Sequence, residues 1–261
     1  MARLCTLFSG SSGNCSYISW AGGSVLVDAG ASLKSIKREA SLAGADLNNL
    51  KAVFVTHTHS DHISGLRVLL NNYNIPLVAT KVTADILINE DLIPPKTEII
   101  EIDGGAVQIA DIEVSGFATS HDAEGSCGYT FLLPGEKKVA VCTDLGVVTE
   151  EVRNAVTGSN AVIIESNHDV TMLKNGPYPP YLKLRIMSDK GHLSNNACAA
   201  ELPALINSGT TRFVLAHLSR KNNLPQIAFN TAKTAFALAG ADESDYILKV
   251  APVTAGEMLY L

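Results

Sequence analysis

Short runs of valine, isoleucine and other apolar residues recur along this chain, and turn residues separate them. Such runs are typical of strands that are buried on at least one face. We expect strands at 23–28, 52–56, 128–133, 138–142, 161–165 and 212–216. Amphipathic stretches between them predict helices at 32–43, 62–72, 82–88, 195–206 and 225–239. This alternation predicts an α/β or α+β fold, with sheet packed inside helices.

Composition favours one compact domain over residues 1–261. The chain has 46% apolar and 18% charged residues, which is enough apolar material for a sizeable core. No apolar run approaches the roughly 18 residues of a membrane span, and the first residues lack the apolar core of a signal peptide. We therefore expect a soluble, cytoplasmic protein with no membrane association. The 5 cysteines form no C-x-x-C pair and are expected to be reduced thiols.

Charge is unevenly distributed along the chain. The formal net charge is −6, yet residues 171–222 hold seven basic and two acidic side chains. An acidic total argues weakly against a nucleic-acid partner, whereas a local basic segment can bind anions. The segment 171–222 is therefore expected to form a DNA-facing surface, and an ordinary solvated face is the alternative.

The most informative segment is Thr56-His57-Thr58-His59-Ser60-Asp61-His62, which directly follows a predicted strand. It holds three imidazoles and one carboxylate in close succession. In a turn at a strand end, these side chains can diverge toward two neighbouring points. Nitrogen and oxygen donors of this kind suit transition-metal ions. The segment therefore predicts a site for a pair of metal ions.

Three further donors also lie where predicted strands end. His217 closes the strand at 212–216, Asp144 follows the strand at 138–142, and His121 follows the segment 114–120. A carboxylate such as Asp144 can bridge two cations, and its oxygen favours hard or borderline ions. We expect two divalent ions per chain, with Zn, Mn or Fe as the candidates.

These donors give the chain a resemblance to the metallo-β-lactamase fold superfamily, across essentially its whole length. The matching pattern is Asp28 after a strand, His57-x-His59-x-Asp61-His62, His121, Asp144 and His217. The resemblance implies a four-layered αββα sandwich of two sheets, with the metals at one edge. It implies one metal on His57, His59 and His121. The second metal is implied on Asp61, His62 and His217, with Asp144 as the bridge and Asp28 orienting the histidines.

A finer resemblance is to the YycJ/WalJ branch, whose members are small cytoplasmic bacterial nucleases. Matching segments are Ser9-Gly-Ser-Ser-Gly-Asn14, 120–123, 143–146, 165–169, 191–195, 216–219 and 222–225. The branch implies phosphodiester hydrolysis, with 5′-to-3′ exonuclease action on DNA. The implied nucleophile is a hydroxide held between the two metal ions. We place Asp61 and His192 in the catalytic set.

His192 lies outside the metal pattern, just before the helix predicted at 195–206, for which Ser194 is the expected N-cap. Helix N-termini attract anions. By analogy with tRNA-maturing enzymes of the same fold, His192 is expected to protonate or stabilise the leaving group. The expected substrate contacts are Ser11, Asn14, His168, Lys183, Arg185, Arg220 and Lys221. The expected partner is DNA or RNA, and no obligate protein partner is evident.

The metal donors alone do not select the substrate, because one fold and one ligand set serve several chemistries. A small-molecule thioesterase or lactonase of the same fold is the first alternative. A metal-stabilised regulatory protein without catalytic activity is the second. Loss of a ligand would favour the regulatory protein, but all seven predicted ligands are present.

Overall fold

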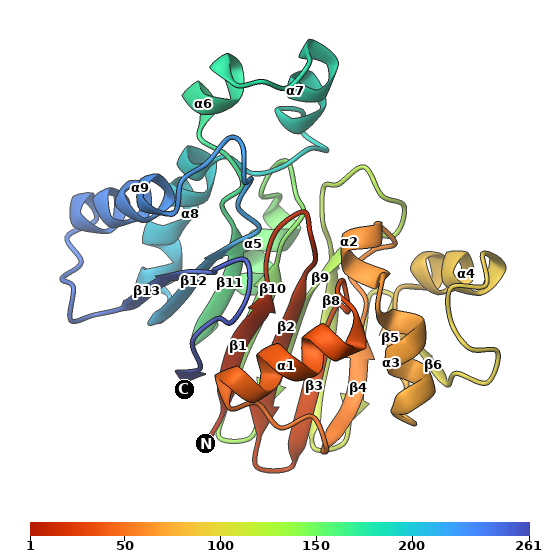
Figure 1. The fold of residues 1–261 in the computed structure, drawn as a ribbon. Coiled ribbons are helices and arrows are strands. Elements are labelled where there is room, and N and C mark those ends of the chain that lie inside the picture. Colours follow the sequence, from red (N-terminus) through yellow and green to blue (C-terminus); the bar gives the residue numbers. More distant parts are fainter.

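The structure is a computed structural model that describes residues 1–261. Two seven-stranded sheets pack face to face, and helices cover the outer face of each sheet (Figure 1). The architecture is therefore the four-layered αββα sandwich predicted above, and the mixed α/β class is confirmed.

The first sheet comes from the N-terminal part of the chain plus its last strand. Its spatial order is β14-β1-β2-β3-β4-β5-β6. The strands are β1 (Arg3–Phe8), β2 (Cys15–Trp20), β3 (Gly23–Val27), β4 (Leu50–Phe54), β5 (Leu77–Ala79), β6 (Ile99–Glu101) and β14 (Leu259–Tyr260). Strands β3 to β6 run parallel to one another, so their carboxyl ends lie at one edge.

The second sheet follows in the order β13-β12-β11-β10-β9-β8-β7. Its strands are β7 (Ala106–Ile109), β8 (Ile112–Ala118), β9 (Cys127–Leu133), β10 (Lys137–Cys142), β11 (Ala161–Glu165), β12 (Arg212–Ala216) and β13 (Ile247–Val250). Strands β10 to β13 are parallel. Strand β9 is antiparallel to both β8 and β10, so β8 and β10 share a direction.

The helices fall into three groups. Helices α1 (Leu33–Ala43), α3 (Leu66–Asn72) and α4 (Lys81–Asn89) pack on the first sheet. Helices α5 (Glu150–Val156), α8 (Asn195–Asn207) and α9 (Pro225–Leu238) pack on the second. Among the short helices, α2 (Ser60–Ile63) follows the carboxyl end of β4, whereas α6 (Val170–Asn175) and α7 (Pro180–Ile186) lie at the top of Figure 1.

The core between the sheets draws on both of them. Side chains of a strand alternate between its two faces, so β3 sends Val25 and Val27 inward and Leu26 toward the helices. The aromatic ring of Phe54 in β4 packs edge-on against Tyr129 and Phe131 in β9, with centroids 5.1 and 5.0 Å apart. This apolar contact fixes how the two sheets, and hence their strand ends, face each other.

The helix predicted at 62–72 is wrong as one helix, because it is divided into α2 and α3. The backbone N–H of Gly65 donates to the carbonyl of Ala29 at 2.8 Å. A Cβ on Gly65 would also overlap the carbonyl oxygen of Ala31. The chain therefore turns at Gly65 to pack against the loop after β3, and this tertiary contact ends the first helix.

The predicted strands are present with shifts of one or two residues at their ends. The predictions missed several elements, among them β1, β2, the short edge strands and α5 to α7. Strand β2 (Cys15–Trp20) is fully buried although Ser16 and Ser19 interrupt its apolar residues. Its sequence therefore lacks the continuous valine and isoleucine run used to recognise the others.

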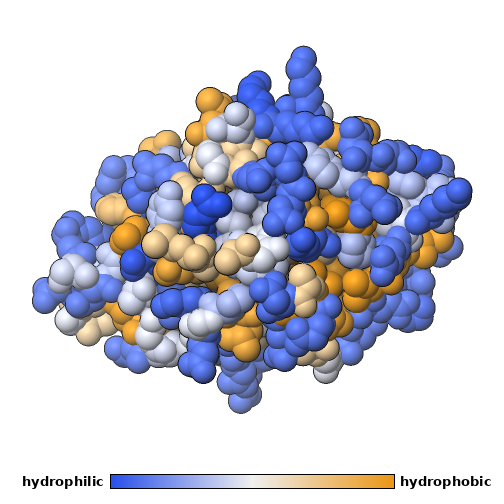
Figure 2. All heavy atoms as spheres, turned by 90° about the horizontal axis from the view of Figure 1, so that it is seen from below, coloured by the Kyte–Doolittle hydropathy of each residue, from blue (hydrophilic) through white to orange (hydrophobic).

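Figure 2 shows the end of the molecule opposite α6 and α7. Hydrophilic residues surround this view, and hydrophobic residues lie between them in several groups, as is ordinary for a protein surface. None of the helices is long and apolar enough to cross a membrane. All 5 cysteines are buried and unpaired, as expected for reduced thiols.

Candidate metal centre

The predicted donors meet at the carboxyl ends of strands from both sheets. Asp28 follows β3, the 57–62 segment follows β4, Asp144 follows β10, and His217 follows β12. Three of these residues have left-handed backbone, with φ of 63° at Asp28, 59° at Asp144 and 57° at His217. Such φ values are uncommon for residues other than glycine and concentrate at functional sites. The strand ends thus turn sharply to aim these side chains.

The first group of donors is His57, His59 and His121, whose ligand atoms all lie within 4.8 Å of one another. His59 Nδ1 lies 3.0 Å from His57 Nε2 and 3.3 Å from His121 Nε2. His121 Nδ1 lies 3.1 Å from the carbonyl oxygen of Gly191, which accepts its proton. This contact leaves His121 Nε2 free to act as a ligand.

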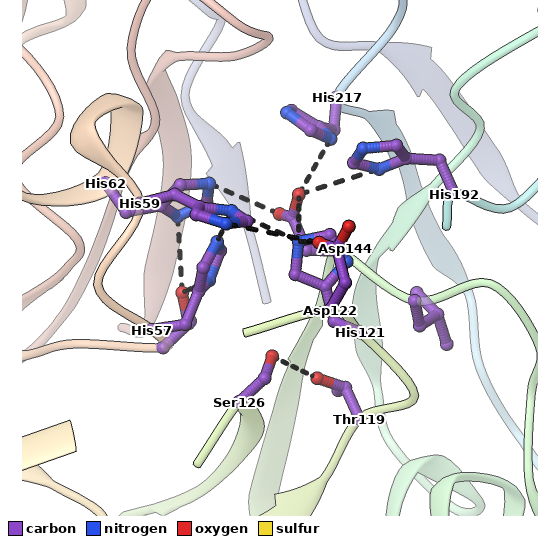
Figure 3. A network of polar contacts seen from close by, with 12 residues as sticks. His57, His59, His62, Thr119, His121, Asp122, Ser126, Asp144, His192 and His217 are labelled. Atoms are coloured by element: carbon purple, nitrogen blue, oxygen red, sulfur yellow. Dashed lines mark hydrogen bonds and ion pairs between the residues drawn. The ribbon is translucent and has the colours of Figure 1, made fainter. Parts of the chain in front are cut away.

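The second group is Asp61, His62 and His217, whose ligand atoms also lie within 4.8 Å of one another. In Figure 3, Asp144 lies among the labelled histidines, with His59 and His62 to its left and His217 above it. Its Oδ2 is 3.3 Å from His62 Nε2, and its Oδ1 is 4.0 Å from His121 Nε2. The structure therefore brings together the same two triads that the resemblance implied, with Asp144 placed where a bridging carboxylate would lie.

Two buried carboxylates orient the imidazoles of the second triad. Asp28 Oδ2 lies 2.8 Å from His62 Nδ1, and Glu165 Oε1 lies 2.6 Å from His217 Nδ1. Each carboxylate accepts the Nδ1 proton, so Nε2 of each ring has a lone pair directed at the site. The position of Asp28 agrees with its predicted function of orienting the histidine motif.

The same carboxylates change the protonation of these histidines. Burial opposes a charge on His62, but Asp28 and Asp144 outweigh burial and raise its pKa to about 9. Burial likewise opposes a charge on His217, whereas Asp144, Asp61 and Glu165 hold its pKa well above the usual range. In His57, burial and the neighbouring His62 lower the pKa well below the usual range. The second triad thus has an electrostatic environment that favours positive charge.

Unpartnered buried atoms show that this donor set fits divalent cations. Asp144 Oδ2 and His217 Nε2 are buried and make no hydrogen bond of good geometry. A buried polar atom without a partner is costly by about 1–3 kcal/mol. Both atoms belong to the candidate ligand set, and nitrogen and carboxylate donors are those that divalent transition metals prefer.

A cavity of about 340 Å³ opens over the donors and also contains His192. His192 Nδ1 lies 2.9 Å from Glu165 Oε1, and the His192 ring centroid is 5.2 Å from those of His121 and His217. Burial lowers the pKa of His192, but Glu165 outweighs this effect and raises it. Ser194 caps α8 by accepting from the N–H of Ala197, as expected.

The predicted substrate contacts do not all reach this cavity. Ser11 and Arg185 line it. Arg185 is paired with Asp122 through two hydrogen bonds, one of them 3.0 Å long. Asn14 is buried instead, where its amide lies 2.9 Å from His62 Nε2 and its Oδ1 accepts from the N–H of Gly10. Asn14 therefore braces the small-residue loop and the histidine motif.

The other predicted contacts lie outside the cavity lining. Lys183 donates to the carbonyl of Lys174 at 2.8 Å, and Arg220 donates to the Ser12 hydroxyl at 2.7 Å. Lys221 is exposed. His168 is 2% exposed, and burial lowers its pKa to about 4, so it is a neutral interior histidine.

The basic residues of segment 171–222, predicted to face DNA, do not all lie at the donor end of the strands. Arg212 begins β12, whereas His217 follows the other end of that strand. Arg212 bonds to the carbonyl of Tyr260 at 3.4 Å, away from the donors. The length of β12 separates Arg212 from His217, so charges that are close in sequence lie at opposite ends of the strands.

Two carboxylates at the site escaped the sequence predictions. Glu165 is completely buried and contacts both His192 and His217. Asp122 Oδ1 lies 3.5 Å from His121 Nε2 and also binds Arg185. A signal was available for Glu165, because a glutamate that ends an otherwise apolar strand, Ala161–Glu165, requires a buried partner.

Residues 24–218 match the Beta-lactamase superfamily domain family. The chain belongs to this superfamily, and its fold and His/Asp cluster make it a metal-dependent hydrolase. It is 39% identical to Exodeoxyribonuclease YycJ of Bacillus anthracis over 85% of this chain and 84% of that protein. It is 35% identical to Exodeoxyribonuclease WalJ of Streptococcus pneumoniae serotype 2 (strain D39), covering 89% of this chain and 87% of that protein.

Solved structures agree on the fold. The metallo-beta-lactamase fold protein YhfI from Bacillus subtilis superposes with a TM-score of 0.74 at 17% identity, covering 99% of this chain and 98% of that one. Zn²⁺-bound PqqB from Methylobacterium extorquens gives a TM-score of 0.73 at 17% identity, with 100% of both chains covered.

Proposed function

We propose that this chain is a binuclear metal-dependent phosphodiesterase that acts as a 5′-to-3′ exonuclease on DNA. The observation that carries the proposal is the position of His192. It lies outside both donor triads yet lines the same cavity, and Glu165 holds its Nδ1 at 2.9 Å. A hydrolase that only activates water has no need of such a group, whereas an alkoxide leaving group needs a proton. Relatives named exodeoxyribonuclease, at 35% and 39% identity, support DNA as the substrate.

The proposed chemistry divides the work between the metals and the chain. Divalent ions held by the two triads and Asp144 would supply a deprotonated water as the nucleophile and neutralise charge on the phosphate. The chain supplies the proton: Glu165 accepts from Nδ1 of His192 and raises the pKa of this histidine, which favours a second proton on Nε2. That Nε2 proton passes to the departing oxygen.

The DNA contacts are proposed for the rim of the cavity. Arg220 bonds to Ser12 in the small-residue loop, and Ser11 of the same loop lines the cavity. Lys221 follows Arg220 and is exposed. These cations can neutralise phosphates of the strand that enters the site. We also propose that residues 1–261 work as one domain, because the core between the sheets draws on both halves of the chain.

A substrate panel tests the proposed function. The protein, loaded with Mn²⁺ or Zn²⁺, is given 5′-labelled and 3′-labelled DNA, RNA, a bis-nitrophenyl phosphodiester and a thioester. We expect DNA to be shortened from its 5′ end and the thioester to remain intact. Hydrolysis of the thioester without hydrolysis of any phosphodiester would establish the small-molecule alternative instead. A well-folded, metal-loaded protein that hydrolyses none of these substrates would favour the regulatory alternative.

The variant His192→Ala tests the mechanism within the same panel. Loss of a general acid should slow DNA cleavage by about 10²- to 10⁴-fold. Hydrolysis of the nitrophenyl diester should fall much less, because nitrophenolate leaves without a proton. Metal content should equal that of the parent protein. Equal losses on both substrates, or loss of metal, would remove His192 from the position of general acid.

A further inference from the structure

One wall of the cavity comes from a segment that the metal chemistry does not use. We call residues 170–187, which comprise α6, α7 and the loop between them, the arm. Tyr178, Leu182, Arg185 and Ile186 of the arm line the cavity. They share it with donors such as Asp61, Asp144 and His217. In Figure 1 the arm stands above the carboxyl ends of the strands.

The arm is anchored to the site at both ends. At its end, the N–H of His192 donates to the carbonyl of Ile186 at 2.9 Å. A Cβ on Gly191 would overlap the same carbonyl, so only glycine permits this approach. At its start, the N–H of Asp169 donates to the carbonyl of Asn222 at 2.9 Å. The arm is thus held at both ends beside the site, and Tyr178 lines the same cavity as His192.

The two faces of the arm differ in chemistry. The helical spacing of Leu182, Arg185 and Ile186 turns these side chains toward the cavity. Tyr181 and Leu184 point elsewhere, and they are 74% and 68% exposed. On the cavity side, the charge of Arg185 is paired with Asp122. The remaining wall is one half-buried tyrosine with two aliphatic side chains, which suits a flat apolar group better than a phosphate.

The size of the cavity limits what can lie against Tyr178. Its volume of about 340 Å³ is at the small end of the range for ligand pockets, about 300–1,000 Å³. Such a volume accommodates one nucleotide. It is too small to enclose both strands of a duplex. A terminal nucleotide that has left its complement can therefore enter the cavity and bring its phosphate to the donors.

We propose that Tyr178 stacks on the base of the terminal nucleotide and thereby stabilises the unpaired state in which the end is cleaved. This inference rests on the proposed function and adds a requirement to it: the end must fray before cleavage. Aromatic side chains stack on any base, so Tyr178 would bind the end without reading its sequence. Stacking compensates for the loss of pairing, as it does in other enzymes that act on extruded bases.

The test compares Tyr178→Ala with Tyr178→Phe and with Tyr181→Ala as the matched control. Tyr181 is the same residue type in the same arm but does not line the cavity. Each metal-loaded protein is assayed on three substrates. They are a duplex whose 5′-terminal pair is matched, the same duplex with a terminal mismatch, and the nitrophenyl diester, which has no base. We expect the parent protein to cleave the mismatched end faster. Tyr178→Ala should lower kcat/KM on the matched end by about 5- to 150-fold.

The controls separate stacking from other effects. Tyr178→Phe keeps the ring and should retain nearly parental activity, as should Tyr181→Ala. The ratio of DNA cleavage to diester hydrolysis should fall only in Tyr178→Ala, which also reports whether that variant retains a working site. Equal activity of Tyr178→Ala and Tyr181→Ala on DNA would overturn the proposal. So would equal defects in Tyr178→Phe and Tyr178→Ala, or a parent protein that ignores the terminal mismatch.

Failure of this inference can be told apart from failure of the proposed function. A parent protein that cleaves DNA from its 5′ end, together with an unimpaired Tyr178→Ala variant, overturns the stacking proposal alone. A parent protein that hydrolyses the diester but no DNA overturns both.

Discussion

Replacing Glu165 by glutamine should damage both the stability and the chemistry of the site. Both carboxylate oxygens of Glu165 are used in the buried interior. Oε1 accepts from Nδ1 of His192 and of His217, at 2.9 and 2.6 Å. Oε2 accepts from the backbone N–H groups of Leu145 and Leu193, both at 3.1 Å. Glu165 therefore joins the proposed general acid, a candidate metal ligand and two loops.

The size of the effect follows from counting these donors. Glutamine keeps one oxygen and places an NH₂ group where the other oxygen was. In either amide orientation, two buried N–H donors lose their acceptor, at a cost of about 1–3 kcal/mol each. The free energy of unfolding should therefore fall by about 2–6 kcal/mol. Metal affinity should fall by about 10- to 100-fold, since this carboxylate orients His217.

The assays compare Glu165→Gln with Glu201→Gln. Glu201 pairs with Arg153 on the surface, with N–O distances of 2.7 and 2.8 Å, and exposed pairs of this kind contribute about 0–1 kcal/mol. Urea unfolding of the metal-free proteins measures stability, and competition with a chelator measures metal affinity. DNA turnover is measured at saturating metal, where the weakened support of His192 should still slow cleavage. A Glu165→Gln variant that matches Glu201→Gln in all three assays would refute this account of the site.

Three other perturbations give distinct outcomes. Asp144→Ala should reduce metal at both triads, because the carboxylate lies 3.3 Å from His62 of the second triad and 4.0 Å from His121 of the first; elemental analysis showing two ions per chain would contradict this. Replacing Arg220 and Lys221 by alanine should weaken DNA binding at all sequences and flatten the dependence of affinity on salt concentration. If binding titrations show an unchanged salt dependence, Arg220 and Lys221 are ordinary surface cations. Burial raises the pKa of Cys5 and of Cys198 to about 12, whereas an unfolded thiol ionises near pH 8.5. As the pH rises, these thiols therefore lose their protons in the unfolded state first, so the free energy of unfolding should decrease above about pH 9. Equal midpoints of urea unfolding at pH 7.5 and pH 10 would disprove this prediction.

The candidate donors were predictable from sequence because each is a local feature. The histidine-rich segment follows an apolar strand, and Asp144 and His217 follow two others. Strands of like direction bring their carboxyl ends to one edge of a sheet, so donors at those ends meet once the topology is known. The resemblance supplied that topology, and the two triads then assembled as implied.

The pairing of side chains was not predictable in the same way. From the sequence, Arg185 and Asn14 were both expected to contact the substrate. In the structure Asp122 neutralises Arg185, and Asn14 turns inward to His62. These partners are 63 and 48 residues away in sequence, and nothing in the local pattern around either residue identifies them.

The sequence by itself determined the fold class and the donor types, because the periodicity of apolar residues and the chemistry of side chains are properties of short segments. Only the tertiary structure decided that Glu165 links His192 to His217, that Gly65 divides a helix, and that Tyr178 lines the same cavity as the donors. Each of these depends on close packing between distant segments. A buried polar group is costly unless it is hydrogen-bonded, and a backbone in close contact leaves no room for a side chain. Both conditions are set by residues distant in sequence.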